Sequence, residues 1–520
     1  MLSTSVHDLL EQNLDDDVAR DRVALVDGTQ RVTYGELGAR VESLASWLTA
    51  QGVKRGDRVG VHLLKSIEEV VATFAIARVG GVFVNVNHQR TLDQLYYSLL
   101  DSGSRVVVVE GRRAAEMAKQ PSIPSEIERI LVRGKTPAHD RMVAWKDVPD
   151  ASCPVTKVID ADVAAILYTS GSTGKPKGVV LSHLNIVQGA RSVARYLENT
   201  RDDRLLSVLP FSFDYGMNQL MTMLLVGGQV VLQGVSMASE VVKAAALHGC
   251  TGLACVPPLW IPIVRYLEIE KVPLPSLRYV TNSGGAIPPG ILRAMPEVFP
   301  GTKIFLMYGL TEAFRSTFLP PELFHEKMGS MGKAIPNAEI FVIKDGAVAG
   351  PNEEGELVHR GSLVSLGYWG KPEATAEKIK PCPELRHLIG DEEVCYSGDR
   401  VRLDEDGFLW FVGRTDSMIK CSGHRVSPTE VEDVVYESRA VGDCVAFGVK
   451  HEELGEVVHV AVSGLEGAPV DEAALAIFCR QKMPTFMQPA KIHVWSGEMP
   501  RNANGKLDRP VIVRACSERS

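Results

Sequence analysis

The sequence predicts an α/β protein with a large N-terminal domain of α/β sublobes, a small β-rich region and a small α+β C-terminal domain. From residue 163 to residue 307, short β-rich runs alternate with helical patterns, which is typical of βαβ units around a largely parallel sheet. After Glu339 the pattern changes to short strands with glycine-rich turns. A polar junction, Gly413 to Asp416, then leads into a compact α+β tail.

The alternating part predicts two sublobes. The first contains a helix, a strand, a helix and a strand at Leu37 to Leu48, Arg58 to Leu63, Ile67 to Val79 and Arg105 to Glu110. Strands of the second are expected at Val163 to Tyr168, Leu205 to Leu209, Gln229 to Gln233, Gly252 to Val256, Leu277 to Thr281 and Lys303 to Met307. Helices between them are expected at Ile186 to Leu197, Glu240 to Leu247 and Ile287 to Phe299.

The remaining elements belong to the β-rich region and the tail. Strands of the β-rich region are expected at Gly355 to Arg360, Glu393 to Leu403 and Gly407 to Val412. In the tail, Ser427 to Glu430 is typical of a capping box with proline at the first helical position, which opens a helix through Glu437. Further tail elements are strands at Val441 to Val449, Val457 to Val462 and Lys491 to Trp495, and a helix at Asp471 to Gln481. We therefore expect domains at residues 1–415 and 416–520.

Composition and charge exclude several classes of function. Hydrophobic residues make up 45% of the 520 residues and charged residues 23%, as in ordinary globular proteins. The 56 basic and 64 acidic residues give a net charge of −8, so an anionic ligand must be held by local positive charge rather than by the whole surface. Met1 to Asp17 lacks a basic leader with an apolar run, and the strongest apolar stretches are too short to span a membrane. We expect a cytoplasmic protein that binds neither nucleic acid nor membrane.

Nine scattered cysteines without a CxxC pair suit reduced thiols. His248, Cys250 and Cys255 are grouped between a helical and a strand-like stretch. We expect this group to be structural rather than a metal site.

The most informative segment runs from Tyr168 to Gly178, directly after an expected strand. Its three glycines let the backbone approach a ligand, its hydroxyls and N–H groups donate hydrogen bonds, and its two lysines supply charge. The spacing does not fit a Walker A loop, which disfavours P-loop NTPase chemistry. A flexible Gly/Ser linker is the alternative, and the lysines around Pro176 argue against it.

Four further loops carry unusual residues. Asn282 to Ala286 and Tyr308 to Glu312 each follow a strand end, where α/β proteins bind ligands. Tyr396 to Asp399 offers a carboxylate able to accept two ribose hydroxyls, and Asn502 to Asp508 sets a lysine on a turn. Each of these segments alone is more often a solvated loop than a site.

In this order and spacing, the motifs resemble those of the acyl-adenylate-forming superfamily, which includes acyl- and aryl-CoA synthetases, adenylation domains of peptide synthetases and beetle luciferase. The resemblance covers about Leu25 to Arg509. It implies a large N-terminal domain with a mobile C-terminal domain. It also implies that the enzyme makes an acyl-AMP from a carboxylic acid and ATP, releases pyrophosphate, and passes the acyl group to a thiol.

The resemblance also implies roles for single residues, with ATP and Mg²⁺ as cofactors. Thr311 would contact an α-phosphate oxygen, Glu312 would bind Mg²⁺, and Lys506 would bridge the carboxylate and the α-phosphate. Asp399 would take the ribose hydroxyls, with Arg414 nearby. The β- and γ-phosphates would lie on Thr169, Ser170, Gly171, Ser172, Thr173, Gly174 and Lys177. The adenine would lie among Ser283, Gly284, Gly285, Ala286, Tyr308 and Gly309.

The same resemblance assigns a hinge and a thiol tunnel. Asp416 matches the hinge about which the C-terminal domain rotates. That rotation would remove Lys506 and present a tunnel segment at the active site, so that one site serves two reactions. The tunnel residues would include Lys420, Ser422, Gly423 and His424.

The motifs disagree about the substrate. Tyr168 to Gly178 and Asn504 to Arg509 look more like amino-acid adenylation domains, whereas Ile419 to Arg425 looks more like acyl-CoA synthetases. Asp214 matches the position where amino-acid-activating enzymes place an aspartate against the substrate ammonium, and Arg315 is a candidate for a second carboxylate. Alternatively, Asp214 caps a helix beginning near Met217, and Arg315 pairs only with a protein carboxylate. The other expected substrate contacts are Phe213, Ser283 and Phe314.

Three hypotheses about function follow. The first is activation of an amino acid or β-amino acid and its transfer to the phosphopantetheine of an acyl carrier protein or of CoA. The second is an acyl-CoA synthetase for a fatty or aryl acid. The third, an adenylate-binding protein without turnover, is disfavoured because Lys506, Glu312, Asp399 and the phosphate loop are all present. Because no carrier segment follows Asp508, we expect a separate thiol acceptor.

Overall fold

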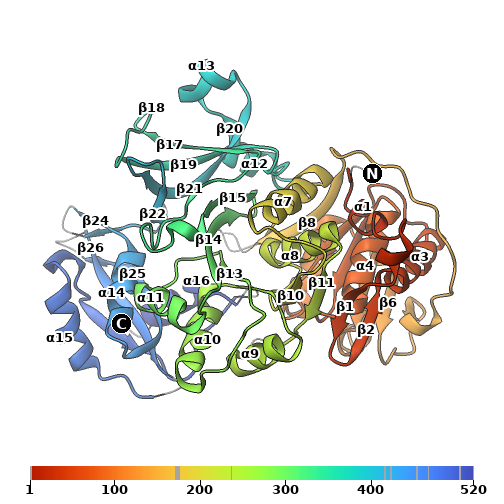
Figure 1. Ribbon diagram of the computed structural model, residues 1–520, viewed down its shortest axis with the longest axis horizontal. Helices are drawn as coiled ribbons and strands as arrows, with labels where there is room; N and C mark the ends of the chain where they lie inside the picture. Colours follow the sequence, from red (N-terminus) through yellow and green to blue (C-terminus); the bar gives the residue numbers. More distant parts are fainter. Residues whose placement is uncertain are drawn as a thin grey trace.

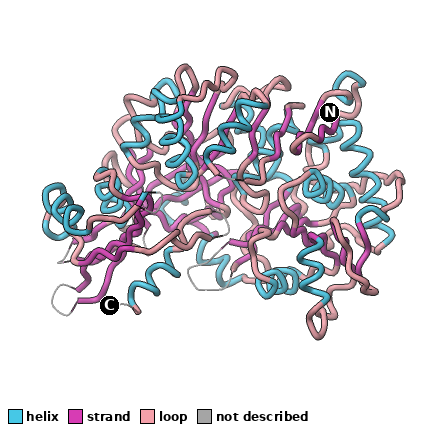
Figure 2. The backbone as a smooth tube through the Cα atoms, turned by 90° about the horizontal axis from the view of Figure 1, so that it is seen from below, coloured by secondary structure: helices cyan, strands magenta, loops and turns pink. Residues whose placement is uncertain are grey.

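The computed structural model describes residues 3–169, 176–235, 237–414, 417–421, 424–451, 455–465, 468–502 and 505–518. Figure 1 shows two α/β sublobes, a β-rich region above the second, and the C-terminal domain in blue. Helices flank the strands on the outside in the second view (Figure 2). This layering is what the alternating pattern predicted.

The first sublobe is a mostly parallel sheet in the order β7-β6-β5-β3-β4-β8-β9. Its strands are β3 (Arg58–His62), β4 (Val82–Asn85), β5 (Val106–Glu110), β6 (Arg129–Arg133), β7 (Met142–Ala144), β8 (Val163–Thr169) and β9 (Lys177–Ser182). Its helices include α3 (Tyr34–Ala50), α4 (Ile67–Arg78), α5 (Leu92–Ser102) and α6 (Gly111–Ala118). Strand β9 was not anticipated from the sequence; it pairs antiparallel with β8, so the phosphate-loop segment connects the two strands of a hairpin.

The second sublobe is a sheet in the order β16-β15-β14-β13-β12-β10-β11-β1-β2. Its strands are β1 (Val23–Asp27), β2 (Gln30–Thr33), β10 (Arg204–Ser207), β11 (Gln229–Leu232), β12 (Gly252–Cys255), β13 (Tyr279–Asn282), β14 (Lys303–Leu310), β15 (Ala313–Leu319) and β16 (Lys333–Ala334). Its helices are α7 (His183–Tyr196), α8 (Asp214–Val226), α9 (Ala238–Leu247), α10 (Pro257–Glu270) and α11 (Pro289–Val298), with the short α1 (Asp8–Glu11) and α2 (Asp17–Arg20) before β1. Strands β1 and β2 therefore join a sheet whose other strands come much later in the chain.

The β-rich region follows as a sheet in the order β18-β17-β19-β21-β20, with β22 paired to β21. Its elements are β17 (Ala338–Lys344), β18 (Ala347–Val348), β19 (Glu354–Gly361), α12 (Pro372–Lys378), β20 (Ile379–Pro381), α13 (Arg386–Ile389), β21 (Glu393–Leu403) and β22 (Leu409–Arg414). The three strands expected here from the sequence correspond to β19, β21 and β22.

The C-terminal domain has a sheet in the order β24-β23-β26-β25, with β27 paired to β26. Its elements are β23 (Ile419–Cys421), β24 (His424–Val426), α14 (Pro428–Glu437), β25 (Val441–His451), β26 (Gly455–Gly464), α15 (Glu472–Lys482), β27 (Lys491–Val494) and α16 (Arg509–Ser517). It has a hydrophobic core of its own, formed by residues such as Val431, Val435, Val460, Leu475 and Cys479. A separate core is what allows this unit to move as a body.

The capping box expected at the start of α14 does not form. Pro428 does occupy the first helical turn, but the Ser427 side chain makes no capping hydrogen bond within the described part of the chain. Ser427 is buried, and its hydroxyl lies against Gly413 of β22, where an added Cβ would be 3.1 Å away. Packing of the helix start onto the N-terminal domain has displaced the local cap.

Neither a metal cluster nor a membrane-spanning helix occurs among the described residues. Within the ranges given above, no three His, Cys, Asp or Glu side chains are grouped so as to hold a metal, and Cys250 and Cys255 are buried. No helix in those ranges is both long and apolar enough to cross a bilayer.

Candidate active site

The candidate site lies where the carboxyl ends of β13 and β14 meet the β-rich region and the C-terminal domain. Residues 283–286 follow β13, and residues 308–312 form the end of β14 and the turn into β15. Helix α14 of the C-terminal domain packs against α11 and β22 of the N-terminal domain (Figure 1). This docking brings the turn before α16 to the same edge of the sheet.

Lys506 reaches from that turn into the N-terminal domain. Its Nζ lies 5.5 Å from the centre of the Phe213 ring. A Cβ added to Gly284 would lie 3.1 Å from Nζ and would crowd the end of the lysine, and the φ of +79° at Gly284 favours glycine at this position. Burial lowers the pKa of Lys506, and the carboxylates of Asp214 and Asp399 oppose this shift. The Lys506 ammonium therefore lies close enough to both carboxylates to interact with them electrostatically.

Asp214 and Arg315 form a buried ion pair beside Lys506. The side chains are 5% and 3% exposed, and Arg315 Nη1 lies 3.5 Å from Asp214 Oδ2. The Thr311 hydroxyl donates to Asp214 Oδ1 at 3.4 Å. Burial raises the pKa of Asp214; Arg315 and Lys506 act against this increase, and Glu312 adds to it. The surroundings of the Asp214 carboxylate therefore favour a cationic partner.

The start of α8 explains why Asp214 is buried. A Cβ on Gly216 would lie 2.2 Å from the Pro210 carbonyl oxygen, so only glycine lets this helix approach the preceding loop so closely. Helix α8 begins at Asp214 itself rather than near Met217, and its N-cap residue is Phe213. The alternative that Asp214 caps the helix therefore does not describe this structure. The alternative that Arg315 pairs with a protein carboxylate describes the structure, and the partner is Asp214.

Glu312 is positioned by an aromatic residue that the motifs did not predict. The Tyr368 hydroxyl donates to Glu312 Oε1 at 2.5 Å. Lys177 Nζ lies 5.1 Å from the centre of the Tyr368 ring, and the Thr169 hydroxyl donates to the Lys177 carbonyl at 3.5 Å. Burial and the Glu312 carboxylate raise the pKa of Tyr368, so its hydroxyl stays protonated. The only hint in the sequence is an aromatic pair between two glycines, Gly367 and Gly370.

Tyr308 and Arg414 contact Asp399 at the other side of the site. The Tyr308 hydroxyl donates to Asp399 Oδ2, and Arg414 Nη1 lies 3.7 Å from Oδ1. Asp399 and Arg414 are direct partners in the pairing of β21 with β22. The Tyr308 ring stacks on His359, with ring centres 5.9 Å apart and an interplanar angle of 14°. Burial lowers the pKa of His359 to about 3, so this second unpredicted aromatic is neutral at pH 7.

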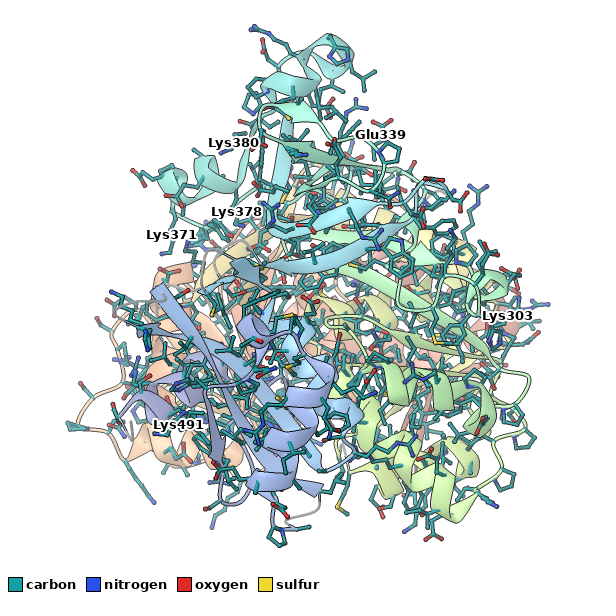
Figure 3. All side chains as sticks on the ribbon, turned by 90° about the vertical axis from the view of Figure 1, so that its left-hand side faces the viewer. Lys303, Glu339, Lys371, Lys378, Lys380 and Lys491 are labelled. Atoms are coloured by element: carbon teal, nitrogen blue, oxygen red, sulfur yellow. The ribbon has the colours of Figure 1, made fainter. Side chains whose placement is uncertain are left out.

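Lys378 is a further residue that sequence reasoning missed. Its Nζ donates at 3.0 Å to the carbonyl of Ser397, two residues before Asp399. Figure 3 faces the C-terminal domain and shows Lys371, Lys378 and Lys380 along one side of the β-rich region. Lys378 therefore places a positive charge close to the segment that carries Asp399, despite the net charge of −8.

The other predicted contacts are the residues after β13, Gly309 and Phe314. Ser283 is buried, Gly285 and Ala286 are exposed, and the Asn282 amide donates to the Gly285 carbonyl at 2.9 Å, which fixes this loop. Gly309 backs onto Arg315, because an added Cβ would lie 3.3 Å from the Arg315 Cα. Phe314 is fully buried against Gly189 of α7, so it supports the Arg315 backbone from behind rather than facing the open site.

Several predicted residues cannot be placed. Ser170, Gly171, Ser172, Thr173, Gly174, Asp416, Ser422 and Gly423 lie outside the described residues. Lys420 and His424 lie on β23 and β24, where Lys420 pairs with Arg425 and Cys421 with His424. The side chains of Lys420 and His424 are also outside the described part. The hinge and the tunnel remain predictions.

Comparison with known proteins identifies the family. Residues 14–369 match the family model described as AMP-binding enzyme, and residues 430–506 match the AMP-binding enzyme C-terminal domain. The chain belongs to the AMP-binding enzyme family. The resemblance inferred from the motifs is thereby confirmed.

Named relatives agree with this assignment. The 2-succinylbenzoate–CoA ligase of Geobacillus kaustophilus (strain HTA426) is 31% identical over 496 residues, which cover 95% of each chain. The o-succinylbenzoate CoA synthetase of Bacillus subtilis, solved with its acyl-adenylate OSB-AMP, is 27% identical with a TM-score of 0.82 and 97% coverage of each chain. The same synthetase has been solved with ATP and magnesium ion, at 27% identity and a TM-score of 0.81, covering 96% of this chain and 98% of that one.

The fold is shared more widely. The anthranilate CoA ligase AuaEII, in complex with anthranoyl-AMP, superposes with a TM-score of 0.89 at 24% identity, covering 100% of this chain and 98% of that chain. Together these findings make the protein an adenylate-forming acid–thiol ligase that uses ATP and Mg²⁺. The predicted two-domain α/β fold is confirmed as well.

Proposed function

We propose that this ligase activates an amino acid or β-amino acid and transfers it to the phosphopantetheine thiol of an acyl carrier protein or of CoA. The proposal of an amine-containing substrate rests on Asp214. Its carboxylate is 5% exposed and lies beside Thr311, Arg315 and Lys506. A buried carboxylate at a site for small acids needs a cationic or hydrogen-bonding partner. A substrate ammonium would supply a charge-assisted bond to Asp214.

In the first half-reaction, a carboxylate oxygen of the substrate attacks the α-phosphorus of ATP, and the bond to pyrophosphate breaks. Two anions must approach each other, so positive charge at this point lowers the barrier. We assign this role to Lys506, whose lowered pKa reflects burial beside Gly284. The Thr311 hydroxyl, which donates to Asp214 in this structure, would turn to donate to an α-phosphate oxygen.

Glu312 fits a role at the metal. Its carboxylate offers the hard oxygen ligand that Mg²⁺ prefers, and Mg²⁺ bound there would neutralise part of the phosphate charge. Tyr368 fixes one carboxylate oxygen, and Lys177 lies close by on the phosphate-loop hairpin. This arrangement matches the chemistry of a triphosphate carrying a divalent cation.

Asp399 fits the ribose. Its carboxylate is 7% exposed and is oriented by Tyr308 and Arg414, so it can accept hydroxyl hydrogens in a fixed direction. The adenine would lie by the backbone of residues 284–286, where the exposed Gly285 and Ala286 leave room for a flat ring. Stacking on His359 holds Tyr308 at the edge of this pocket.

In the second half-reaction, the thiol sulfur attacks the acyl carbon, the acyl–phosphate bond breaks, AMP leaves, and the thiol proton passes to solvent. We propose that rotation about Asp416 withdraws Lys506 and brings β23 and β24 to the site. The separate core of the C-terminal domain supports a rotation of this unit as one body.

Paired acids test the proposal. ATP–pyrophosphate exchange should proceed faster with an amino acid than with its deamino analogue, by roughly 10- to 100-fold in kcat/KM, because one charge-assisted bond contributes about 1.5–3 kcal/mol. Asp214→Ala should abolish this preference. If Asp214→Ala leaves the ratio between the two acids unchanged, the amine assignment is wrong. Mass analysis with CoA and with a phosphopantetheinylated carrier protein then identifies the acceptor.

One observation favours a second candidate function, an acyl-CoA synthetase for a fatty or aryl acid. Asp214 already has Arg315 as a cationic partner, so the carboxylate does not require a substrate amine. The relatives named above as CoA ligases support this alternative. It predicts that deamino acids are used as well as or better than amino acids.

A further inference from the structure

A lysine of the first sublobe reaches into the second sublobe, outside the site described above. Lys65 lies between β3 and α4, and its Nζ donates to the Ser207 hydroxyl at 2.8 Å and to the Leu209 carbonyl at 2.5 Å. These acceptors lie at the end of β10 and in the loop that leads to α8. The Phe211 ring of the same loop covers the ammonium, with Nζ 3.9 Å from the ring centre. One cation therefore makes three contacts with the segment before α8.

The charge of this lysine is compensated by Glu69, a residue of the first turn of α4 that is 6% exposed. Burial lowers the pKa of Lys65 and raises the pKa of Glu69, and each charge opposes the shift of the other. A well-packed apolar pair of similar volume is often at least as stable as a buried ion pair. Fold stability alone therefore explains this pair poorly, and its contacts indicate a further role.

The Leu209 carbonyl links the lysine with the start of α8. A Cβ on Gly216 would lie 2.7 Å from the Leu209 oxygen and 2.2 Å from the Pro210 oxygen, so α8 rests directly on these two carbonyls. The Phe213 N–H donates to the Pro210 carbonyl at 3.1 Å, which closes the turn before the helix. Because α8 begins at Asp214, the position of this turn sets the position of the Asp214 carboxylate.

The lysine acts on the site only from behind this loop. In the described ranges, Lys65 has no hydrogen bond or ion pair with Asp214; its hydrogen bonds go to Ser207 and Leu209. Lys65 also lies on the wall of a groove of about 1450 Å³ that residues of both domains line. Ser212 and Gly505 line the same groove, each next in the chain to a residue of the site. An experiment must therefore separate an effect on the loop from an effect on a molecule that enters the groove.

We propose that Lys65 is a positioning residue for the acid: through the Leu209 carbonyl and the Phe211 ring, it holds the loop that places Phe213 and Asp214 against the substrate. This proposal rests on the proposed function, because it takes Asp214 as a contact of the acid. The acid pocket in the second sublobe then depends on a cation supplied by the first.

Lys65→Met tests the proposal by ATP–pyrophosphate exchange. Methionine keeps an unbranched apolar side chain but removes the charge and the donors. Because a misplacement of about 1 Å can cost about a hundredfold in rate, we expect kcat/KM for the acid to fall by roughly 10- to 100-fold. Most of this loss should appear as a higher KM for the acid, whereas the KM for ATP should stay within about twofold, because the expected ATP contacts lie on other segments.

Two further variants separate positioning from folding. Arg78, at the end of α4, is a second cation paired with carboxylates, those of Glu11 and Glu42, and it is 6% exposed. Arg78→Met should lower the melting temperature and leave the KM for the acid unchanged. Ser207→Ala removes one acceptor of the lysine without changing any charge, so it decides the question if Lys65→Met does not fold. It should raise the KM for the acid in the same direction by a smaller factor.

The outcomes distinguish this proposal from the proposed function. If no acid supports exchange in the wild type, the proposed function itself fails. If the wild type is active and Lys65→Met leaves kcat/KM for the acid unchanged, or raises the KM for acid and ATP by the same factor, the positioning role is overturned and the function stands. A normal exchange reaction with a raised KM for CoA or pantetheine would also overturn it, because Lys65 would then serve the thiol in the groove.

Discussion

Gly284→Ala should slow adenylation by displacing Lys506. An added Cβ would lie 3.1 Å from Nζ and 3.2 Å from Cε of Lys506, where ordinary contact begins at 3.4 Å. The end of the lysine must therefore move by a few tenths of an ångström. Because a misplacement of about 1 Å can cost about a hundredfold in rate, we expect a loss of several-fold to about tenfold in adenylation kcat.

The same substitution also strains the backbone, because Gly284 has φ +79°. A left-handed alanine costs about 1–2 kcal/mol in stability. Gly301 provides a matched control: its φ is +74°, and an added Cβ there would meet nothing within 4 Å. Gly301→Ala should therefore show a similar loss of stability with unchanged exchange activity.

The assay measures both half-reactions. ATP–pyrophosphate exchange reports adenylation, and thioester formation from a supplied acyl-adenylate reports the step for which Lys506 should withdraw. Gly284→Ala should slow the first much more than the second. Equal exchange rates in Gly284→Ala and Gly301→Ala, at equal stability, would refute the contact between Gly284 and Lys506 as a determinant of catalysis.

Two further predictions concern Lys506 and His359. Lys506→Ala should fold normally and lose on the order of a hundredfold or more in exchange, the effect of removing one preorganised charge donor; unchanged exchange would contradict its assignment. Burial lowers the pKa of His359 to about 3. Between pH 6.5 and pH 3, the unfolded chain therefore binds a proton that the folded protein does not bind. The stability of the fold falls as the pH drops through this range. His359→Gln should therefore reduce the stability lost between pH 7 and pH 5 by about 2 kcal/mol, measured by chemical denaturation at both values; an identical loss in both proteins would count against a neutral buried His359.

Local patterns predicted most of the elements. The strands and helices expected between residues 163 and 307 occur as β8, α7, β10, β11, α9, β12, β13, α11 and β14, with ends that differ by a few residues. The spacing of apolar residues in these elements reflects contacts between each residue and its near neighbours in the sequence. The hairpin strand β9 was missed because its first residues, from Lys177, belong to the glycine- and lysine-rich segment that predicted a loop.

The site was predicted as separate segments of the chain. Thr311, Glu312, Asp399 and Lys506 do converge on one edge of the second sheet. Tyr368, His359 and Lys378 were not anticipated, because nothing in their local sequence shows that they contact Glu312, Tyr308 and Ser397. Such contacts depend on how the β-rich region packs on the second sublobe.

The sequence by itself determined the family, the two-domain α/β fold and the chemistry of an adenylating ligase, because motifs of about ten residues or fewer indicate them. Only the tertiary structure decided which charges meet. From the sequence, Asp214 and Arg315 were candidates for separate substrate contacts, with pairing of Arg315 to a protein carboxylate as the alternative. In the structure they form one buried pair that joins positions 101 residues apart. The physical reason is that a motif fixes the conformation of its own segment, whereas the partner of a buried charge is chosen by the packing of distant elements, here α8 against β15.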